Sequence, residues 1–282
     1  MIEQYFCEFY RKADRYSNLW QRNYLLAQSV QLLAIVLVAV FSNFRSSGAL
    51  WTVVFFAIAI LAQLYRYVMK PDEKWWNGRA GAESAKTLCW RYVVCGSPFE
   101  KTNTEADELM SSRITDIARN VAKIIPIPVS EGHITAEMRT QRMRPINERI
   151  ENYQVNRIRA QMSWYSTKST LNSRRARLWT AVAILAQTLG LTIGIVSLAK
   201  RWHFDLIEFF SASSVAVVAW MAVKQFDVLA RSYAVASSEL SQIDSEISHQ
   251  NWTEEQWSKY VNSSEEAVSR EHTSWRASRG IE

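Results

Sequence analysis

The side chains best suited to chemistry are few and widely spaced in this sequence. They are the cysteines and histidines Cys7, Cys89, Cys95, His133, His203, His249 and His272. No two cysteines have CxxC spacing, and no histidine lies in an HExxH pattern, so the usual metal-ligand arrangements are missing. The nucleophile-elbow, phosphate-loop and dinucleotide-binding patterns are missing too. We therefore expect a protein that is not an enzyme and that holds no cofactor or metal.

Two local pairs of reactive residue types give no reaction centre either. Cys89 and Cys95 are close in sequence near the end of one expected helix, which favours an incidental buried thiol over a redox pair. Glu271 and His272 are adjacent, and adjacent side chains on a helix point in different directions.

A second group of polar side chains stands inside long apolar stretches, where they are costly against lipid and normally face protein or water. The group consists of Gln28, Gln31, Gln187, Thr188, Thr192, Glu208, Ser211 and Ser214. Each can either line a conduit or form hydrogen bonds between packed helices. Gly190 and Gly194 form a GxxxG pattern, which by itself predicts close contact between helices.

The apolar stretches that carry these residues are long enough to cross a bilayer. Residues 178–199 contain no charged side chain, and at ~1.5 Å rise per residue a helix of this length spans the hydrocarbon core. Further spans are expected at about 25–44, 49–68 and 206–224. The charged stretch before the first span is too long for a cleavable signal peptide, so this span is expected to stay. The fold class predicted is all-α: an integral membrane protein with four transmembrane helices in two hairpins plus long cytoplasmic helices.

Lysine and arginine are distributed unevenly around the expected spans. Fourteen lie near span ends on the side of both termini and the central segment, whereas only Arg45, Lys200 and Arg201 lie on the other side. The positive-inside rule then places both termini in the cytoplasm, with the spans in a bacterial inner membrane. The net charge of +6 is concentrated at membrane borders. This favours contact with the lipid bilayer over nucleic acid as a partner.

The segments outside the spans are expected to form amphipathic helices. The string after Pro71 is rich in tryptophan, with charges at helical spacing, and either packs at the headgroup layer and on neighbours or binds a ligand. The fourth span is expected to continue without a breaker into a heptad seam over 226–247, which either packs within the chain or self-associates. The candidate assembly or trigger surface comprises Trp75, Trp76, Arg79, Glu83, Trp90, Arg91, Leu229, Tyr233, Leu240 and Ile243.

Several boundaries divide the chain into two similar halves. A helix is expected from Thr104 to Lys123, with Leu109, Ile117, Val121 and Ile124 along one flank, followed by a linker at 126–134 that contains Pro126, Pro128 and Gly132. A basic helix bends near Pro145, and TEEQ at 253–256 forms a capping box. An N-terminal module (1–125) and a C-terminal module (135–282) repeat the same layout at an offset of about 155 residues, which suggests duplication.

The string WWNGRAGAESAKTLCWRYVVCGSPF, at 75–99, closely resembles the cytoplasmic segment of SLATT domains, which are bacterial two-span modules. SYAVASSELSQI at 232–243 and SREHTSWRASR at 269–279 resemble a second SLATT module of another type. The resemblance implies a membrane effector of antiviral conflict systems that permeabilises the inner membrane when its sensor fires. No fused sensor is visible, so the trigger is expected to be a separate sensor protein or a nucleotide second messenger.

Four helices from one chain scarcely enclose an aqueous lumen, so a channel requires a homo-oligomer. The alternative is a membrane-anchored scaffold or sensor whose cytoplasmic helices recruit a partner enzyme. A small multidrug-type transporter is disfavoured, because the one carboxylate in a span, Glu208, stands near the span end.

Overall fold

The computed structural model describes residues 5–42, 44, 48–100, 102–125, 133–200 and 206–277, with the side chains of Lys200 and of residues 270–277 left aside. Within these ranges the regular elements are helices and no strand occurs, which confirms the predicted all-α class. The predicted linker lies largely outside the described residues.

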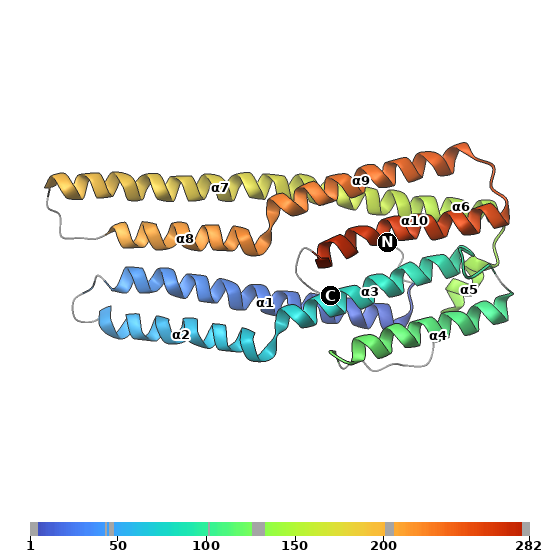
Figure 1. Ribbon diagram of the computed structural model, residues 1–282, viewed down its shortest axis with the longest axis horizontal. Helices are drawn as coiled ribbons and strands as arrows, with labels where there is room; N and C mark the ends of the chain where they lie inside the picture. The colour runs from blue at the N-terminus through green and yellow to red at the C-terminus, as the bar shows by residue number, and fades with distance from the viewer. Residues whose placement is uncertain are drawn as a thin grey trace. The chain divides into compact units, whose positions relative to one another are not determined.

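Four helices carry the expected spans. They are α1 (Glu8–Phe41), α2 (Gly48–Met69), α7 (Ala160–Lys200) and α8 (Leu206–Lys224). Each is long and apolar enough to cross a membrane, or belongs to a longer helical run that is, as predicted. Few residues in their most apolar windows are buried by the rest of the chain. In Figure 1, α2 returns alongside α1, and α8 alongside α7.

A single left-handed residue ends the second helix of each hairpin. Lys70 has φ 44° and separates α2 from α3 (Pro71–Val93); Gln225 has φ 50° and separates α8 from α9 (Phe226–His249). A positive φ is unfavourable for a residue with a side chain, so each position interrupts the helix. The fourth span was expected to continue into the next helix, and the structure inserts this one residue. Lys70 and Gln225 are 155 residues apart, which matches the repeat offset seen in the sequence.

The chain divides into two compact units. Unit 2 comprises Gln21–Asp72 and Ser169–Arg231 and contains the four expected spans. Unit 1 comprises Met1–Trp20, Glu73–Lys168 and Ser232–Glu282. Each unit therefore takes segments from both sequence modules.

Unit 1 is held together by an aromatic core. The rings of Phe6, Trp90, Tyr153 and Trp257 form successive edge-on contacts, with centroids 6.4, 6.0 and 5.6 Å apart. All four side chains are nearly or completely buried. They come from the start of the chain, from α3, from α6 (Ile146–Tyr153) and from α10 (Glu254–Ala277), so both modules build one core.

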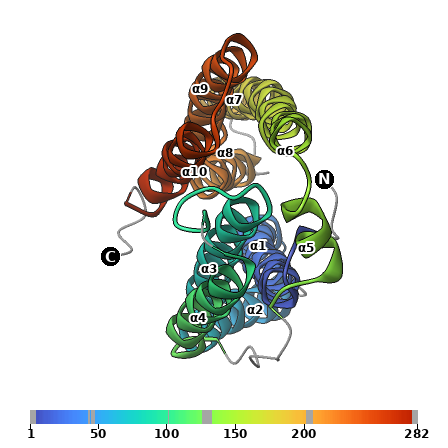
Figure 2. The ribbon, with the colours of Figure 1, turned by 90° about the vertical axis from the view of Figure 1, so that its right-hand side faces the viewer.

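The fourth helix, α4 (Asn103–Ala122), lies along α3 (Figures 1 and 2). It buries a face other than the predicted one. Its fully buried residues are Ala106, Met110, Ile114 and Ala118, which follow each other at four-residue spacing. Leu109, Ile117 and Val121 pack only at the edge of this core, and Ile124 is 46% exposed. Alanines stand at the two ends of this buried row, with the larger Met110 and Ile114 between them. The helix begins after Thr102, not at Thr104.

The remaining helices of unit 1 begin at recognisable signals. Thr135 caps α5 (Ala136–Arg142), and Pro145 precedes α6, where the bend was predicted. The predicted capping box of α10 is present, since Thr253 Oγ1 accepts the backbone N–H of Gln256 and the Gln256 side chain accepts that of Thr253. Figure 2 shows α10 beside α9 and α3.

Candidate functional site

In the first hairpin, the two predicted polar span residues differ in their partners. Gln31 donates to Gln63 of α2 (2.9 Å) and accepts from the Arg66 guanidinium (3.0 Å). Gln28 is 8% exposed, and its side-chain oxygen has no partner among the described atoms. Gln31 therefore belongs to the packing between α1 and α2, whereas Gln28 is buried without a bond from its side-chain oxygen.

In the second hairpin, the GxxxG pattern faces the hairpin's own partner helix. A Cβ added at Gly190 would come within 3.3 Å of Phe210 Cβ on α8, and one at Gly194 within 3.9 Å of Ile207. The close helix contact that GxxxG predicts is thus made within the chain. A side chain at Gly190 would press on Phe210 of the hairpin itself, whereas a Cβ at Gly194 would make an ordinary contact with Ile207.

Three polar residues of α7 lie at the middle of the third span, and the chain leaves all three exposed. The hydroxyls of Thr188 and Thr192 donate to the carbonyls of Ile184 and Thr188, so both are satisfied by their own helix. Gln187 differs, because its amide donates once, to Ser214 Oγ of α8 at 3.0 Å. The rest of the Gln187 amide is available to another molecule.

Glu208 and Ser211 lie together at the start of α8. They line an open groove of about 360 Å³ with Leu32 and Ile35 of α1. The Glu208 carboxylate accepts a hydrogen bond from Ser42 Oγ at 3.0 Å. Ser214, one turn further on, is 8% exposed and is occupied by Gln187. The groove therefore presents one carboxylate at an otherwise mostly apolar surface.

The tryptophan-rich helix α3 contributes more to the core of unit 1 than to a surface. Trp90 is 1% exposed, and Arg79 and Glu83 form an ion pair of 3.1 Å in a half-buried position. Arg91 donates to the Asn262 carbonyl of α10 at 3.3 Å. Trp75 and Trp76 are half-buried neighbours with ring centroids 6.2 Å apart.

The heptad seam of α9 packs inside the chain. Leu240 is 2% exposed, and Tyr233 and Ile243 pack against the same core. The Tyr233 ring contacts Trp164 and Tyr165 of α7, with centroids 5.5 Å away in both cases. Leu229, at the start of the seam, is half-buried within unit 2.

Sequence reasoning missed a buried ion cluster at the centre of unit 1. Arg157 donates to both carboxylate oxygens of Glu265, at 2.8 and 2.6 Å, and the two side chains are 2% and 0% exposed. Tyr153 and Thr87 each donate to the same carboxylate at 3.0 Å. Lys86 completes the cluster and lies 3.6 Å from Glu83 and 3.4 Å from Gln161.

The cluster joins the two modules through one carboxylate. Thr87 and Lys86 belong to α3, Tyr153 and Arg157 to the helical segment around residue 155, and Glu265 to α10. Arg157 stands in the π-helical stretch η2 (Gln154–Arg159), and π-helical turns inside helices frequently occur at functional sites. Residues 108 positions apart carry no common motif, so nothing in the sequence signalled the Arg157–Glu265 pair.

Burial and the neighbouring carboxylates act in opposite senses on the pKa values of the two cations and in the same sense on that of Tyr153. Burial lowers the pKa of Lys86 to about 8, although Glu83 partly opposes the shift. Burial alone would lower the pKa of Arg157 too, but the Glu265 carboxylate outweighs it and raises that pKa. Burial and the Glu265 charge together raise the pKa of Tyr153 well above its usual range. Arg157 therefore stays charged, whereas Lys86 can lose its proton in mildly alkaline solution.

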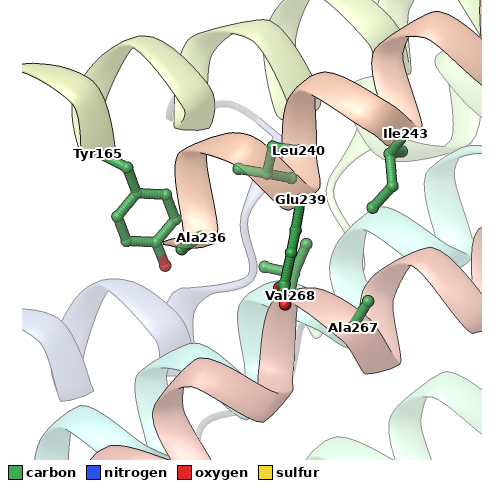
Figure 3. Close-up of a pocket in the computed structure, with 7 residues that line it drawn as sticks. All are labelled: Tyr165, Ala236, Glu239, Leu240, Ile243, Ala267 and Val268. Atoms are coloured by element: carbon green, nitrogen blue, oxygen red, sulfur yellow. The ribbon is translucent and has the colours of Figure 1, made fainter. Parts of the chain in front are cut away.

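A small pocket in unit 1 is too tight for a ligand. It lies between α7, α9 and α10 and is lined by Tyr165, Ala236, Glu239, Leu240, Ile243, Ala267 and Val268 (Figure 3). Its volume of about 10 Å³ is at the lower limit for a single water molecule. We interpret it as an imperfection of packing.

The cysteines show one contact that their sequence spacing concealed. Cys7 and Cys89 are both fully buried, and the Cys7 backbone N–H points at the Cys89 sulfur at 3.5 Å. The hydrogen bond with Cys89 and backbone amides of the first turn of α1 lower the pKa of Cys7, while burial raises that of Cys89. In the part of the chain that the structure describes, no three metal-ligating side chains gather. His133 only approaches Thr115, at 3.4 Å.

Four apolar helices in two hairpins, with an α-helical unit outside them, define a multi-pass membrane protein. Comparison with protein families identifies the family to which it belongs. Residues 7–150 match the SMODS and SLOG-associating 2TM effector domain 3, and residues 153–275 match the SMODS and SLOG-associating 2TM effector domain 1. The chain therefore belongs to the SLATT family and carries two of its domains in tandem. No curated protein and no solved structure matches it.

We expect loss of the Glu265 charge to destabilise unit 1 strongly. Glu265→Gln leaves the Arg157 guanidinium buried without its counter-ion, and breaking such a pair costs about 3–5 kcal/mol. Replacing both partners, as in R157M/E265L, should cost less than either single change. The measurement is thermal or denaturant unfolding in detergent, with the exposed Glu255→Gln as control, which should leave stability almost unchanged. An E265Q protein as stable as the parent would contradict the assignment.

The lowered pKa of Lys86 predicts a stability that depends on pH. Between about pH 8 and its ordinary value of 10.5, the unfolded chain binds a proton that the folded chain has lost. The folded state therefore gains stability as pH rises through this window, by up to about 3 kcal/mol. The measurement is the difference in unfolding free energy between the parent and Lys86→Met at each pH, which removes the contributions of cysteines and tyrosines. A difference that is constant from pH 7.5 to 10 would contradict the prediction.

Proposed function

We propose that the chain is an oligomeric membrane effector of a bacterial antiviral, abortive-infection system. It forms a pore or otherwise disrupts the inner membrane when a separate sensor protein or nucleotide signal engages it. The proposal rests on membership of a family of two-transmembrane effector domains.

The observation that supports oligomerisation is the Gln187 amide, which uses only part of its hydrogen-bonding capacity within the chain. It stands at the middle of the third span, exposed, with a single hydrogen bond to Ser214. A polar group at this depth is costly against hydrocarbon and normally faces protein or water. A second protomer, or water within an assembled pore, would satisfy it.

The orientation that we propose has unit 1 and both termini in the cytoplasm. Its basis is the excess of lysine and arginine near the span ends on that side. The short connections between α1 and α2 and between α7 and α8 would then face the outside of the inner membrane.

The proposed control mechanism acts through helices shared by the two units. Both α1 and α7 are continuous and contribute residues to unit 1 and unit 2. A signal that repacks the ion cluster around Glu265 would bias the arrangement of the helices that continue into the spans. The low flexibility of a packed core favours two discrete states over a gradual change.

We expect Gln187→Leu to weaken self-association, because it removes the amide left over for a second protomer. Interhelical hydrogen bonds in membranes contribute about 1–2 kcal/mol in model peptides, so association should fall roughly fivefold to thirtyfold. The measurements are the mass of the detergent-solubilised protein and the membrane potential of cells that overproduce it.

Two matched variants separate this role from folding. Ser214→Ala removes the bond within the hairpin and keeps the Gln187 amide, and Thr188→Val removes a hydroxyl that its own helix already satisfies. Both should assemble and depolarise like the parent. If S214A fails as Q187L does, Gln187 serves the hairpin only. An assembled protein that leaves the potential intact would favour the scaffold alternative.

A further inference from the structure

The inner end of the second hairpin carries a group of cations without counter-ions. They are Arg174, Arg175, Arg177, Lys224 and Arg231. All belong to unit 2, and no ion pair with any of them occurs among the described side chains. Arg174, Arg175, Arg177 and Arg231 are exposed. In unit 1, by comparison, Arg79, Arg139, Arg149 and Arg157 each pair with a carboxylate.

Two of these cations are held close to one another. Arg175 of α7 and Lys224 of α8 each stand four residues from one ring of the contacting pair Trp179–Trp220, so the two cations lie on neighbouring turns of the hairpin and their charges repel. Lys224 is half-buried, with its ammonium 5.5 Å from the ring centre of Trp220 and 6.0 Å from that of Phe226. Cation–π contacts position an ammonium but leave its charge uncompensated. Like charges so arranged attract an anion that can bridge them.

The aromatic rings beside this pair indicate its depth. Trp179 and Trp220 form an edge-on pair, with centroids 6.5 Å apart, one turn into the spans from Arg175 and Lys224. Tryptophans concentrate where headgroups meet hydrocarbon, because one end of the ring is polar and the other apolar. The two cations therefore lie at the level of lipid phosphates.

We propose that Arg175 and Lys224 bind the phosphate of an anionic phospholipid, with Arg174, Arg177 and Arg231 adding the charge that favours anionic over zwitterionic headgroups. A basic pocket at the cytoplasmic border of membrane helices is a recognised setting for such lipids. The guanidinium of Arg175 can donate two parallel hydrogen bonds to phosphate, whereas Lys224 acts as a point charge. The inference requires the membrane-spanning hairpin and is independent of pore formation.

A lipid-binding experiment on the full-length protein tests this inference. The protein is purified in a mild detergent and titrated with phosphatidylglycerol, with phosphatidylcholine and with inorganic phosphate, and bound lipid is counted by native mass spectrometry alongside the unfolding temperature. The parent should retain phosphatidylglycerol in preference to phosphatidylcholine. The variant R175Q/K224Q should bind phosphatidylglycerol on the order of tenfold more weakly, because each basic residue near the surface adds to the attraction.

The control is Lys259→Gln, which removes an exposed lysine of unit 1 and should leave lipid binding unchanged. The conservative variant K224R keeps the charge and should keep the preference, which distinguishes a lost site from a damaged hairpin. Equal retention of phosphatidylglycerol by R175Q/K224Q and the parent would overturn the proposal. Stabilisation by inorganic phosphate equal to that by phosphatidylglycerol would assign a free-anion site and overturn the lipid assignment.

Discussion

Lipid cannot hydrogen-bond to a peptide group, and this constraint dictates the plan of unit 2. A chain that enters hydrocarbon must satisfy its backbone internally, which favours uninterrupted helices such as α1, α2, α7 and α8. The positions where helices break, Lys70 and Gln225, stand at the ends of the predicted spans, where the backbone reaches water again. Small residues at Gly190 and Gly194 then allow close packing inside one hairpin, because no hydrophobic effect drives helices together in lipid.

Unit 1 follows the packing rules of a protein in water. Water drives burial of a large aromatic core, and this core is built from both sequence modules. The Arg157–Glu265 pair at its centre gains little over an apolar pair in stability, yet it demands one particular arrangement of α3, η2 and α10. If the cluster is the control element proposed above, a repacking that separates the pair leaves a buried charge without its partner.

The features that depend on composition and on local sequence signals could be predicted. The length of the apolar stretches predicted the four spans, Pro145 predicted a bend, and Thr253 with Gln256 predicted the start of α10. The features that depend on contacts between distant segments of the chain could not be predicted. On α4 the sequence predicted the flank of Leu109 and Ile117, whereas tertiary packing buries the row from Ala106 to Ala118. Likewise Glu265 and Cys7 acquire their partners only through folding across 108 and 82 residues, which local patterns cannot register.

The most direct test of the membrane arrangement is cysteine accessibility in intact cells. Single cysteines are introduced at the exposed positions Phe44 and Leu206, which the proposed orientation places outside, and at Lys259 in unit 1. A membrane-impermeant maleimide should label F44C and L206C in intact cells and K259C only after the membrane is opened. Labelling of K259C from outside, or recovery of the protein in the aqueous fraction without detergent, would contradict two hairpins inserted from the cytoplasm.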